Sequence, residues 1–351
     1  MSTDEPAQPA PPAPQTAPAK PRGVRSWASR IFSARTLEAS LLPIAFVLLI
    51  AAFGHARPDT FFQWSNFTTI FGLNAVQLVL AMSLLVPLTN GDLDLSVAEI
   101  SGLTSVLVAW LNVNHHWALG PSILAGLGCG LACGTLNGWI IVHFDVNPFI
   151  ITLATGSIFS GIAFWLPNQL TVAGISTKLT DWTVIHHFLS IPVDFWYGVA
   201  IMLLMWYLLT FTAFGQRALF VGQSRQVARL SGFRVGSIRF SAFVLAGLIA
   251  SISGIINDGV LGSATPGSGN LLLSVYAAVF LGMTTIQPGR FNAIGTGVAV
   301  FFLAVGVNGM NLLGAQTYVQ SLFYGAILVV AVVASRLINR RRAASAARAA
   351  T

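Results

Sequence analysis

The sequence predicts an all-α polytopic membrane protein with about ten transmembrane helices and with both termini in the cytoplasm. Two features of composition carry this prediction: 55% of the 351 residues are hydrophobic and only 8% are charged. The mean hydropathy is accordingly high, at +0.75. A soluble domain carries about 25% charged residues. This chain lacks the polar surface that a soluble fold of its size requires, so its apolar residues must face lipid.

The first part of the chain differs from the rest. Residues 1–36 form a Pro- and Ala-rich tail that ends in a basic segment, and its prolines exclude a stable helix or strand ladder. We expect this tail to be disordered and cytoplasmic. Residues 339–351 are expected to form a second, basic cytoplasmic tail.

Residues 37–338 alternate apolar stretches with short polar breaks, the pattern of a transmembrane domain. About 20 apolar residues cross a bilayer as a helix. The third and eighth spans have only about 15 residues, so tilted, broken or partly re-entrant helices are expected there. The predicted spans are 37–53, 67–88, 97–111, 119–142, 149–166, 195–212, 238–260, 272–286, 291–311 and 318–338.

The basic residues set the orientation. With the N-terminus inside, only Arg57 and Lys178 of the 18 lysines and arginines fall outside. This is the asymmetry of the positive-inside rule, and shifting the register by one span would destroy it. The net charge of +7 therefore reflects cytoplasmic loops. Nucleic-acid binding is not expected, because no stripe of basic and aromatic residues lies on a polar fold.

The fourth span carries four glycines at intervals of four residues. Glycines at this spacing form a smooth helix face that another helix can approach closely. We favour packing within this bundle over a dimer seam. Cys129 and Cys133 share a helix face and are interpreted as small buried residues, with no metal site predicted. The glycines are Gly126, Gly130, Gly134 and Gly138.

Polar residues inside apolar spans are costly in lipid and are therefore informative. Each one either joins helices or lines a path for a hydroxylated solute, and for a single residue the two interpretations are equal. Their recurrence over several spans favours a polar conduit. The candidate pathway residues are Asn74, Gln77, Asp94, Asn137, Asn257, Asp258, Asn308 and Asn311.

A sharp polar break spans residues 90–96, with Asp92 and Asp94 inside it and Glu99 close behind. Gly91 permits an unusual backbone, and Asp94 or Ser96 is placed to cap the following helix. The paired acids also suit proton or cation coupling. No lysine or arginine is expected mid-span as a partner, and no chain of acids crosses the bilayer.

The longest cytoplasmic loop, residues 213–239, contains a short amphipathic helix that Ser224 starts and Gly232 ends. Such a helix lies on anionic lipid or docks on a soluble partner, and physics alone leaves both open. Its candidate contact residues are Gln223, Ser224, Arg225, Ala228, Arg229, Leu230, Ser231 and Gly232.

The sequence shows no chemistry of its own. It has no GxxxxGK[ST] phosphate loop, no HExxH and no GxSxG. We therefore predict no enzyme activity and no cofactor, and any ATP hydrolysis would belong to another chain.

Four segments, in order, resemble the motifs of the monosaccharide permeases of ABC importers, the ribose permease family. The segment 94–97 is similar to "GIDLSVG", and 134–138 with 147–153 to "GLxNG…PPFIVTLGT". Residues 228–233 are similar to "AARLSGI", and 308–314 to "NGLNLLG". Ala98, Asn147 and the turn at 284–290 depart from these patterns, which leaves the usual sugar open.

The resemblance implies a type II-like ABC importer permease fold in the bacterial inner membrane. It implies a second permease copy or paralogue, ATP-binding cassette ATPase subunits inside and an extracytoplasmic sugar-binding protein. It also implies that 213–239 is a coupling loop and that its helix docks on the ATPase. The cargo would be a monosaccharide or a related small polyol.

Two other functions remain as alternatives. A permease of the same superfamily would carry a branched-chain amino acid, a nucleoside or a furanosyl signalling molecule. An ion-coupled secondary transporter or an intramembrane enzyme belongs to a different class, and the sequence shows neither an ion relay nor a catalytic set.

Overall fold

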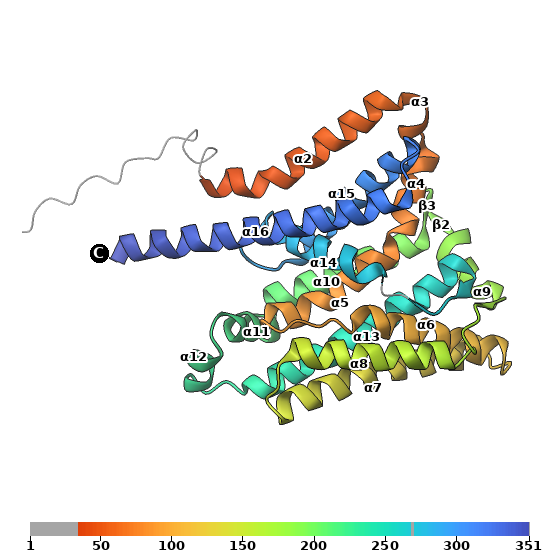
Figure 1. The fold of residues 1–351 in the computed structure, drawn as a ribbon, viewed down its shortest axis with the longest axis horizontal. Coiled ribbons are helices and arrows are strands. Elements are labelled where there is room, and N and C mark those ends of the chain that lie inside the picture. Colours follow the sequence, from red (N-terminus) through yellow and green to blue (C-terminus); the bar gives the residue numbers. More distant parts are fainter. Residues whose placement is uncertain (1–33, 268–269, 351) are drawn as a thin grey trace, which may run out of the picture.

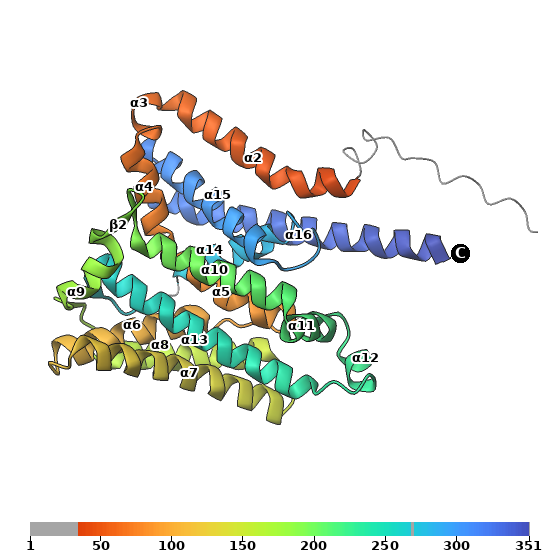
Figure 2. The ribbon, with the colours of Figure 1, turned by 180° about the vertical axis from the view of Figure 1, so that it is seen from behind.

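The computed structural model describes residues 34–267 and 270–350. Most of the predicted N-terminal tail, residues 1–33, lies outside them. Figures 1 and 2 show long helices running in roughly one direction, with α2 along one edge of the bundle and α7 and α8 along the opposite edge. The long helices are α2 (Ala34–Ala56), α5 (Ala75–Thr89), α6 (Val97–Val113), α7 (Leu119–His143), α8 (Pro148–Trp165), α10 (Val193–Phe211), α13 (Val235–Leu261), α14 (Asn270–Gly282), α15 (Ala293–Leu312) and α16 (Thr317–Ala350).

Eight helical segments in the described part of the chain are long and apolar enough to cross a membrane. Two shorter apolar helices, Val97–Val113 and Leu271–Gly282, coincide with the third and eighth predicted spans. The polytopic all-α class is confirmed, and the count of ten holds only if both short helices are included. The last predicted tail, from residue 339, continues α16 as far as Ala350.

The second predicted span is divided into α4 (Trp64–Leu73) and α5 by Asn74. The Asn74 side-chain amide donates to the Ile70 carbonyl at 2.8 Å, and its own carbonyl accepts from Leu78 N–H at 2.9 Å. Because Asn74 completes the last turn of one helix and starts the next, the apolar run continues through a change of direction.

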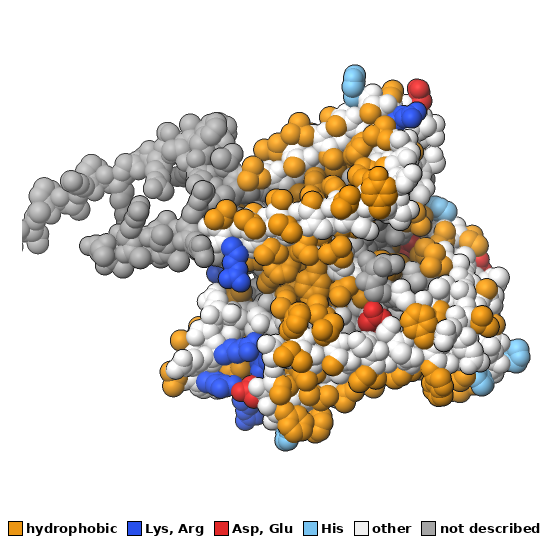
Figure 3. All heavy atoms as spheres, in the orientation of Figure 1, with side chains coloured by type: hydrophobic (Ala, Val, Ile, Leu, Met, Phe, Trp, Pro, Cys, Tyr) orange, Lys and Arg blue, Asp and Glu red, His pale blue; other side chains and the backbone are white. Residues whose placement is uncertain are grey.

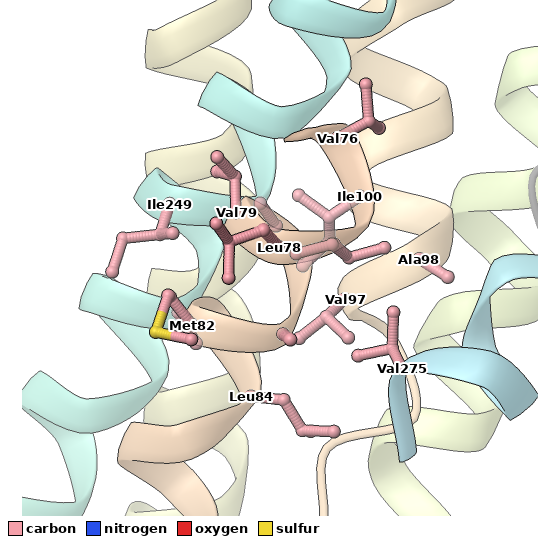
Figure 4. Close-up of a cluster of buried hydrophobic side chains, with 14 of the residues drawn as sticks. Val76, Leu78, Val79, Met82, Leu84, Val97, Ala98, Ile100, Ile249 and Val275 are labelled. Carbon is pink, nitrogen blue, oxygen red and sulfur yellow. The ribbon is translucent and has the colours of Figure 1, made fainter. Parts of the chain in front are cut away.

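All 15 residues of α5 are buried, and α13, α10 and α14 pack around it. In Figure 4, Leu78, Met82 and Leu84 of α5 meet Val97 of α6 and Ile249 of α13. By contrast, Ala331 is the only buried apolar residue among residues 317–337 of α16, and Val329 and Val330 are 64% and 62% exposed. An apolar helix this exposed is suited to lipid or to another membrane subunit.

The glycine face of α7 packs against α13 and, at its start, α6. A Cβ built on Gly126 would collide with Val108 of α6, and one on Gly134 with the Phe243 carbonyl of α13. Gly130 and Gly138 also face α13. On α13, a Cβ built on Gly247 would collide with the backbone of Gly130 and Gly134. The two backbones therefore approach more closely than any side chain would allow.

Short elements connect the long helices. Strands β1 (Val172–Ala173) and β4 (Ser263–Ala264) pair antiparallel, as do β2 (His187–Phe188) and β3 (Ile191–Pro192). The helical turns α3 (Pro58–Phe61), α9 (Thr177–Thr180) and η1 (Asp181–Ile185) lie near them, at one end of the bundle. At the opposite end are α11 (Ala213–Gln223) and α12 (Arg225–Leu230).

Figure 3 shows lysine and arginine side chains gathered at the α11–α12 end. This is the segregation that the positive-inside rule requires of a cytoplasmic face. It places residues 213–239 on the inner side, as the sequence predicts, and the paired strands at the opposite end.

Candidate functional site

The polar break between α5 and α6 is an extended segment folded back into the bundle. Gly91 has φ +76°, a left-handed conformation that favours glycine, and the Asp92 N–H returns to the Pro87 carbonyl at 2.9 Å. Asp92 and Asp94 are 0% and 1% exposed. Charged groups this buried require partners, and the two acids find different ones.

Asp92 is held by two arginines from the cytoplasmic loop. Arg239 of α13, itself 3% exposed, donates from Nε to Oδ2 at 2.8 Å and from Nη2 to Oδ1 at 3.0 Å. Arg225 of α12 donates to Oδ1 at 2.5 Å and to the Gly91 carbonyl at 3.3 Å. The contact of Arg239 with both carboxylate oxygens is bidentate, which is the strongest form of carboxylate recognition. Arg225 joins the start of α12 to the polar break.

Asp94 closes its own turn instead. Its Oδ1 accepts from the Ser96 N–H at 2.9 Å and from the Ser96 hydroxyl at 2.6 Å. Asn137 of α7 donates to the same hydroxyl at 2.8 Å, and the Tyr276 hydroxyl of α14 donates to the Asp94 carbonyl at 3.0 Å. Asp94 and Asn137, both predicted pathway residues, therefore meet in one buried polar cluster.

A second contact fixes the break from α8. The Thr152 hydroxyl accepts from the Leu95 N–H at 3.1 Å and donates to the Pro148 carbonyl at 2.8 Å. Helices α7, α8 and α14 thus all contact the segment 94–96 through hydrogen bonds.

The loop of residues 213–239 has the predicted local structure. The Ser224 hydroxyl accepts from Val227 N–H at 3.3 Å, α12 ends at Leu230, and Gly232 follows with φ +82°. A small core of Ala218, Val221, Ala228, Val235 and Ile238 holds α11 and α12 against α13.

The two arginines of α12 lie four residues apart, but their side chains have different surroundings. Arg225 turns inward to Asp92, whereas Arg229 is exposed. Leu230 and Val227 are 82% and 50% exposed. The outward face of α12 is therefore apolar with one free cation, a surface suited to a groove on a partner.

The end of α11 also packs directly against the end of α5, where the polar break begins. A Cβ added to Gly222 would overlap the Thr89 carbonyl, so only glycine permits this approach of α11. Gln223 and Ser231 are exposed beside it.

The other predicted pathway residues are scattered. Asp258 of α13 is fully buried and accepts from the Ser105 hydroxyl of α6, while its neighbour Asn257 is half-buried. Gln77 of α5 is 6% exposed.

Two of the asparagines join helices. Asn308 of α15 donates to Asn66 of α4 at 2.9 Å, and Asn311 accepts from Gln320 of α16 at 2.9 Å. Asn74 is engaged with its own helix ends, as described above. The structure thus does not gather all eight predicted residues around one path.

Sequence reasoning missed the partners. From the sequence, Asp92 is only one of two acids in the polar break, and Arg239 is only one of the basic residues on the cytoplasmic side. The signal was a basic residue one turn into an apolar helix, a position that requires a counter-charge. Nothing local identifies Tyr276, Thr152 or Asn66 as contacts of the break or of Asn308.

Comparison with known proteins adds a family. The profile of the family described as "Branched-chain amino acid transport system / permease component" matches residues 66–332. The ribose import permease protein of Escherichia coli (strain K12) is 31% identical over 294 residues, which cover 83% of this chain and 91% of that protein.

Further relatives are similar over comparable lengths. The ribose import permease protein of Bacillus subtilis (strain 168) is 31% identical over 289 residues, covering 81% of this chain and 88% of that protein. The D-allose transport system permease protein of Escherichia coli (strain K12) is 27% identical over 294 residues, covering 84% and 90%.

Proposed function

Because this chain belongs to the family of branched-chain amino acid transport system permease components, we propose that it is the membrane-spanning translocation subunit of an ATP-driven importer for a monosaccharide or a related small polyol. It receives solute from an extracytoplasmic binding protein and works with separate ATPase subunits and a second permease subunit. It hydrolyses no ATP itself.

One observation supports this function above the others: the Asp92 ion pairs with Arg225 and Arg239. Arg225 begins the exposed helix α12, and Asp92 lies two residues before the buried Asp94 cluster. A force applied to α12 from the cytoplasm is therefore transmitted by charge-assisted hydrogen bonds to a segment that contacts α7, α8 and α14. Rocking between outward- and inward-open states requires a connection of this kind.

The surface of α12 supports an ATPase partner. It presents Val227, Leu230 and Arg229 beyond the lipid-facing apolar belt, at the basic end of the bundle. An amphipathic helix that docks its apolar residues in a groove is a common mode of protein recognition. This chain contains no GxxxxGK[ST] loop, so the proposal assigns nucleotide hydrolysis to that partner.

Unsatisfied polar atoms support a polar conduit. Among the described residues, Gln77 Nε2, Asn137 Oδ1, Asp258 Oδ2 and Asn308 Oδ1 are buried without a hydrogen-bond partner. Such groups are costly unless water or a hydroxylated solute satisfies them. The named cargoes of the relatives, ribose and allose, favour a sugar, whereas the family description leaves a branched-chain amino acid as the runner-up.

Purification of the tagged chain from gently solubilised native membranes, with mass spectrometry of its partners, tests the proposal. We expect an ATPase with a GxxxxGK[ST] loop together with a secreted sugar-binding protein. An amino-acid-binding protein in its place would support the runner-up. Recovery of the chain alone, still competent for ion-driven transport, would replace the proposal with a secondary carrier.

A matched pair of variants sharpens this experiment. Leu230→Asp places a charge on the exposed face of α12. We expect this variant to co-purify with the binding protein but no longer with the ATPase. Leu313→Asp makes the same change at the outer end of α15, where Leu313 is 49% exposed, and should keep the ATPase. Equal retention of the ATPase by both variants would remove α12 from the interface.

A further inference from the structure

Glu99 is a carboxylate that takes no part in the ion pairs of Asp92 with Arg225 and Arg239. It is the third residue of α6, and from Val97 to Val106 it is the only position that is not fully buried. The rest of this half of the helix is covered by its neighbours. The first part of the helix, from Val97 to Val106, thus places its single acidic residue at the one position that its neighbours leave partly uncovered.

The surroundings of Glu99 are polar but hold no counter-charge. Ser160 of α8 lies beside the carboxylate, and a Cβ on Gly156 would lie 3.7 Å from Glu99 Cγ. No lysine or arginine among the described residues forms an ion pair with it. The small residue at 156 leaves the carboxylate free of a bulky cover from α8.

Glu99 is also isolated in sequence. Helices α6, α8, α14 and α16 contain no other acidic residue. An unpaired carboxylate facing lipid at this position would be strongly disfavoured, so this opening requires water.

We propose that Glu99 lines the solute conduit and sets its charge selectivity. Its carboxylate accepts hydrogen bonds from the hydroxyls of a neutral sugar and repels acidic sugars, because two like charges in a low-dielectric passage repel strongly. This inference rests on the proposed import function and adds a substrate class to it: neutral polyhydroxylated solutes pass, and sugar acids do not.

A reporter thiol measures the local charge without any knowledge of the natural substrate. The two native cysteines are replaced (Cys129→Ala, Cys133→Ala), and Ser160→Cys is introduced in the assembled transporter. Its rates of modification by a cationic and an anionic methanethiosulfonate reagent are compared, with Glu99 present and with Glu99→Gln. We expect the thiol to react with both and the cation-to-anion rate ratio to fall at least threefold in Glu99→Gln.

A control reporter separates local from global effects. Ser237→Cys lies on the exposed cytoplasmic surface of α13, and its rate ratio should not change with Glu99→Gln. A Ser160→Cys thiol that reacts with neither reagent is covered by lipid or by a second copy of the chain, and this result would overturn the inference. A reactive thiol with an unchanged ratio would overturn it equally.

These outcomes are independent of the proposed import function. Partner recovery tests whether the chain belongs to an ATP-driven importer, whereas the thiol rates test only the water access and charge of one position. A transporter that keeps its ATPase and binding protein but fails the thiol test retains its function and loses this role for Glu99.

Discussion

Asp92 and Arg239 form the most buried charge pair among the described residues, at 0% and 3% side-chain exposure. Removing charges from water is expensive, and such a pair is retained only with near-ideal hydrogen bonding. Here the Asp92 carboxylate accepts hydrogen bonds from Nε and Nη2 of Arg239 and from Nη2 of Arg225. At this scale the network is therefore sensitive to the loss of any one member.

We expect Asp92→Asn to lower the free energy of unfolding by about 3–5 kcal/mol, because it leaves the buried Arg239 charge without its counter-ion. The measurement is chemical unfolding of the purified chain in detergent. Asp145→Asn is the control, since Asp145 Oδ1 lies 3.6 Å from Arg239 but its side chain is 72% exposed. Its effect should stay below about 1 kcal/mol, and similar effects of both variants would contradict the assignment.

At the scale of elements, two helices stand out for opposite reasons. Helix α12 is short and exposes its apolar residues, so its stability depends on Ser224, Gly232 and the small core beneath Ala228. Helix α7 is long and carries a glycine face that allows close contact with α13. The first is the surface that we propose for docking, and the second is a packing surface within the bundle.

For α12, we expect Arg229→Glu to uncouple transport while leaving membrane insertion intact, because it reverses the free charge on the docking face without touching the Asp92 network. Sugar uptake and ATPase recovery measure the effect. Arg57→Glu reverses an exposed charge at the outer end and is the control. Unchanged uptake in Arg229→Glu counts against α12 as the coupling helix.

For α7, we expect Gly134→Ala to destabilise the protein by about 1–3 kcal/mol, because the added Cβ meets the Phe243 carbonyl, which cannot move independently of α13. The shift in thermal unfolding midpoint in detergent measures this. Gly128→Ala on the same helix is matched, since nothing lies within 4 Å of its Cβ position. If Gly128→Ala proved equally destabilising, the contact with α13 would not be the cause.

At the scale of the whole molecule, charge and hydropathy give the bundle a direction. The basic residues gather at the α11–α12 end, and the short paired strands lie at the other. The buried helix α5 lies between the two ends, surrounded by α10, α13, α14 and α15. An orientation with α12 in the cytoplasm follows from the positive-inside rule.

Thiol labelling checks this orientation. In the cysteine-free background, His116→Cys in the exposed turn between α6 and α7 should react with a membrane-impermeant reagent on intact cells. Ser231→Cys beside α12 should react only after permeabilisation. Labelling of Ser231→Cys in intact cells would reverse the topology.

The sequence alone determined the membrane class, the positions of the long helices, the inside face and the caps of α12. Each of these depends on residues close together in the chain: hydropathy over about 20 residues, charge counts per loop, or a serine three positions before an amide. The two short spans were also recognised, because length is a local property.

Only the tertiary structure decided which polar residues meet. Asp92 and Arg239 are 147 positions apart, and Tyr276 lies 182 positions from Asp94, so no local pattern specifies either contact. The same holds for Asn308, which pairs with Asn66 rather than standing alone on a path. Pairing in a helical bundle depends on how faces are rotated and stacked, and packing of all the helices together fixes that rotation.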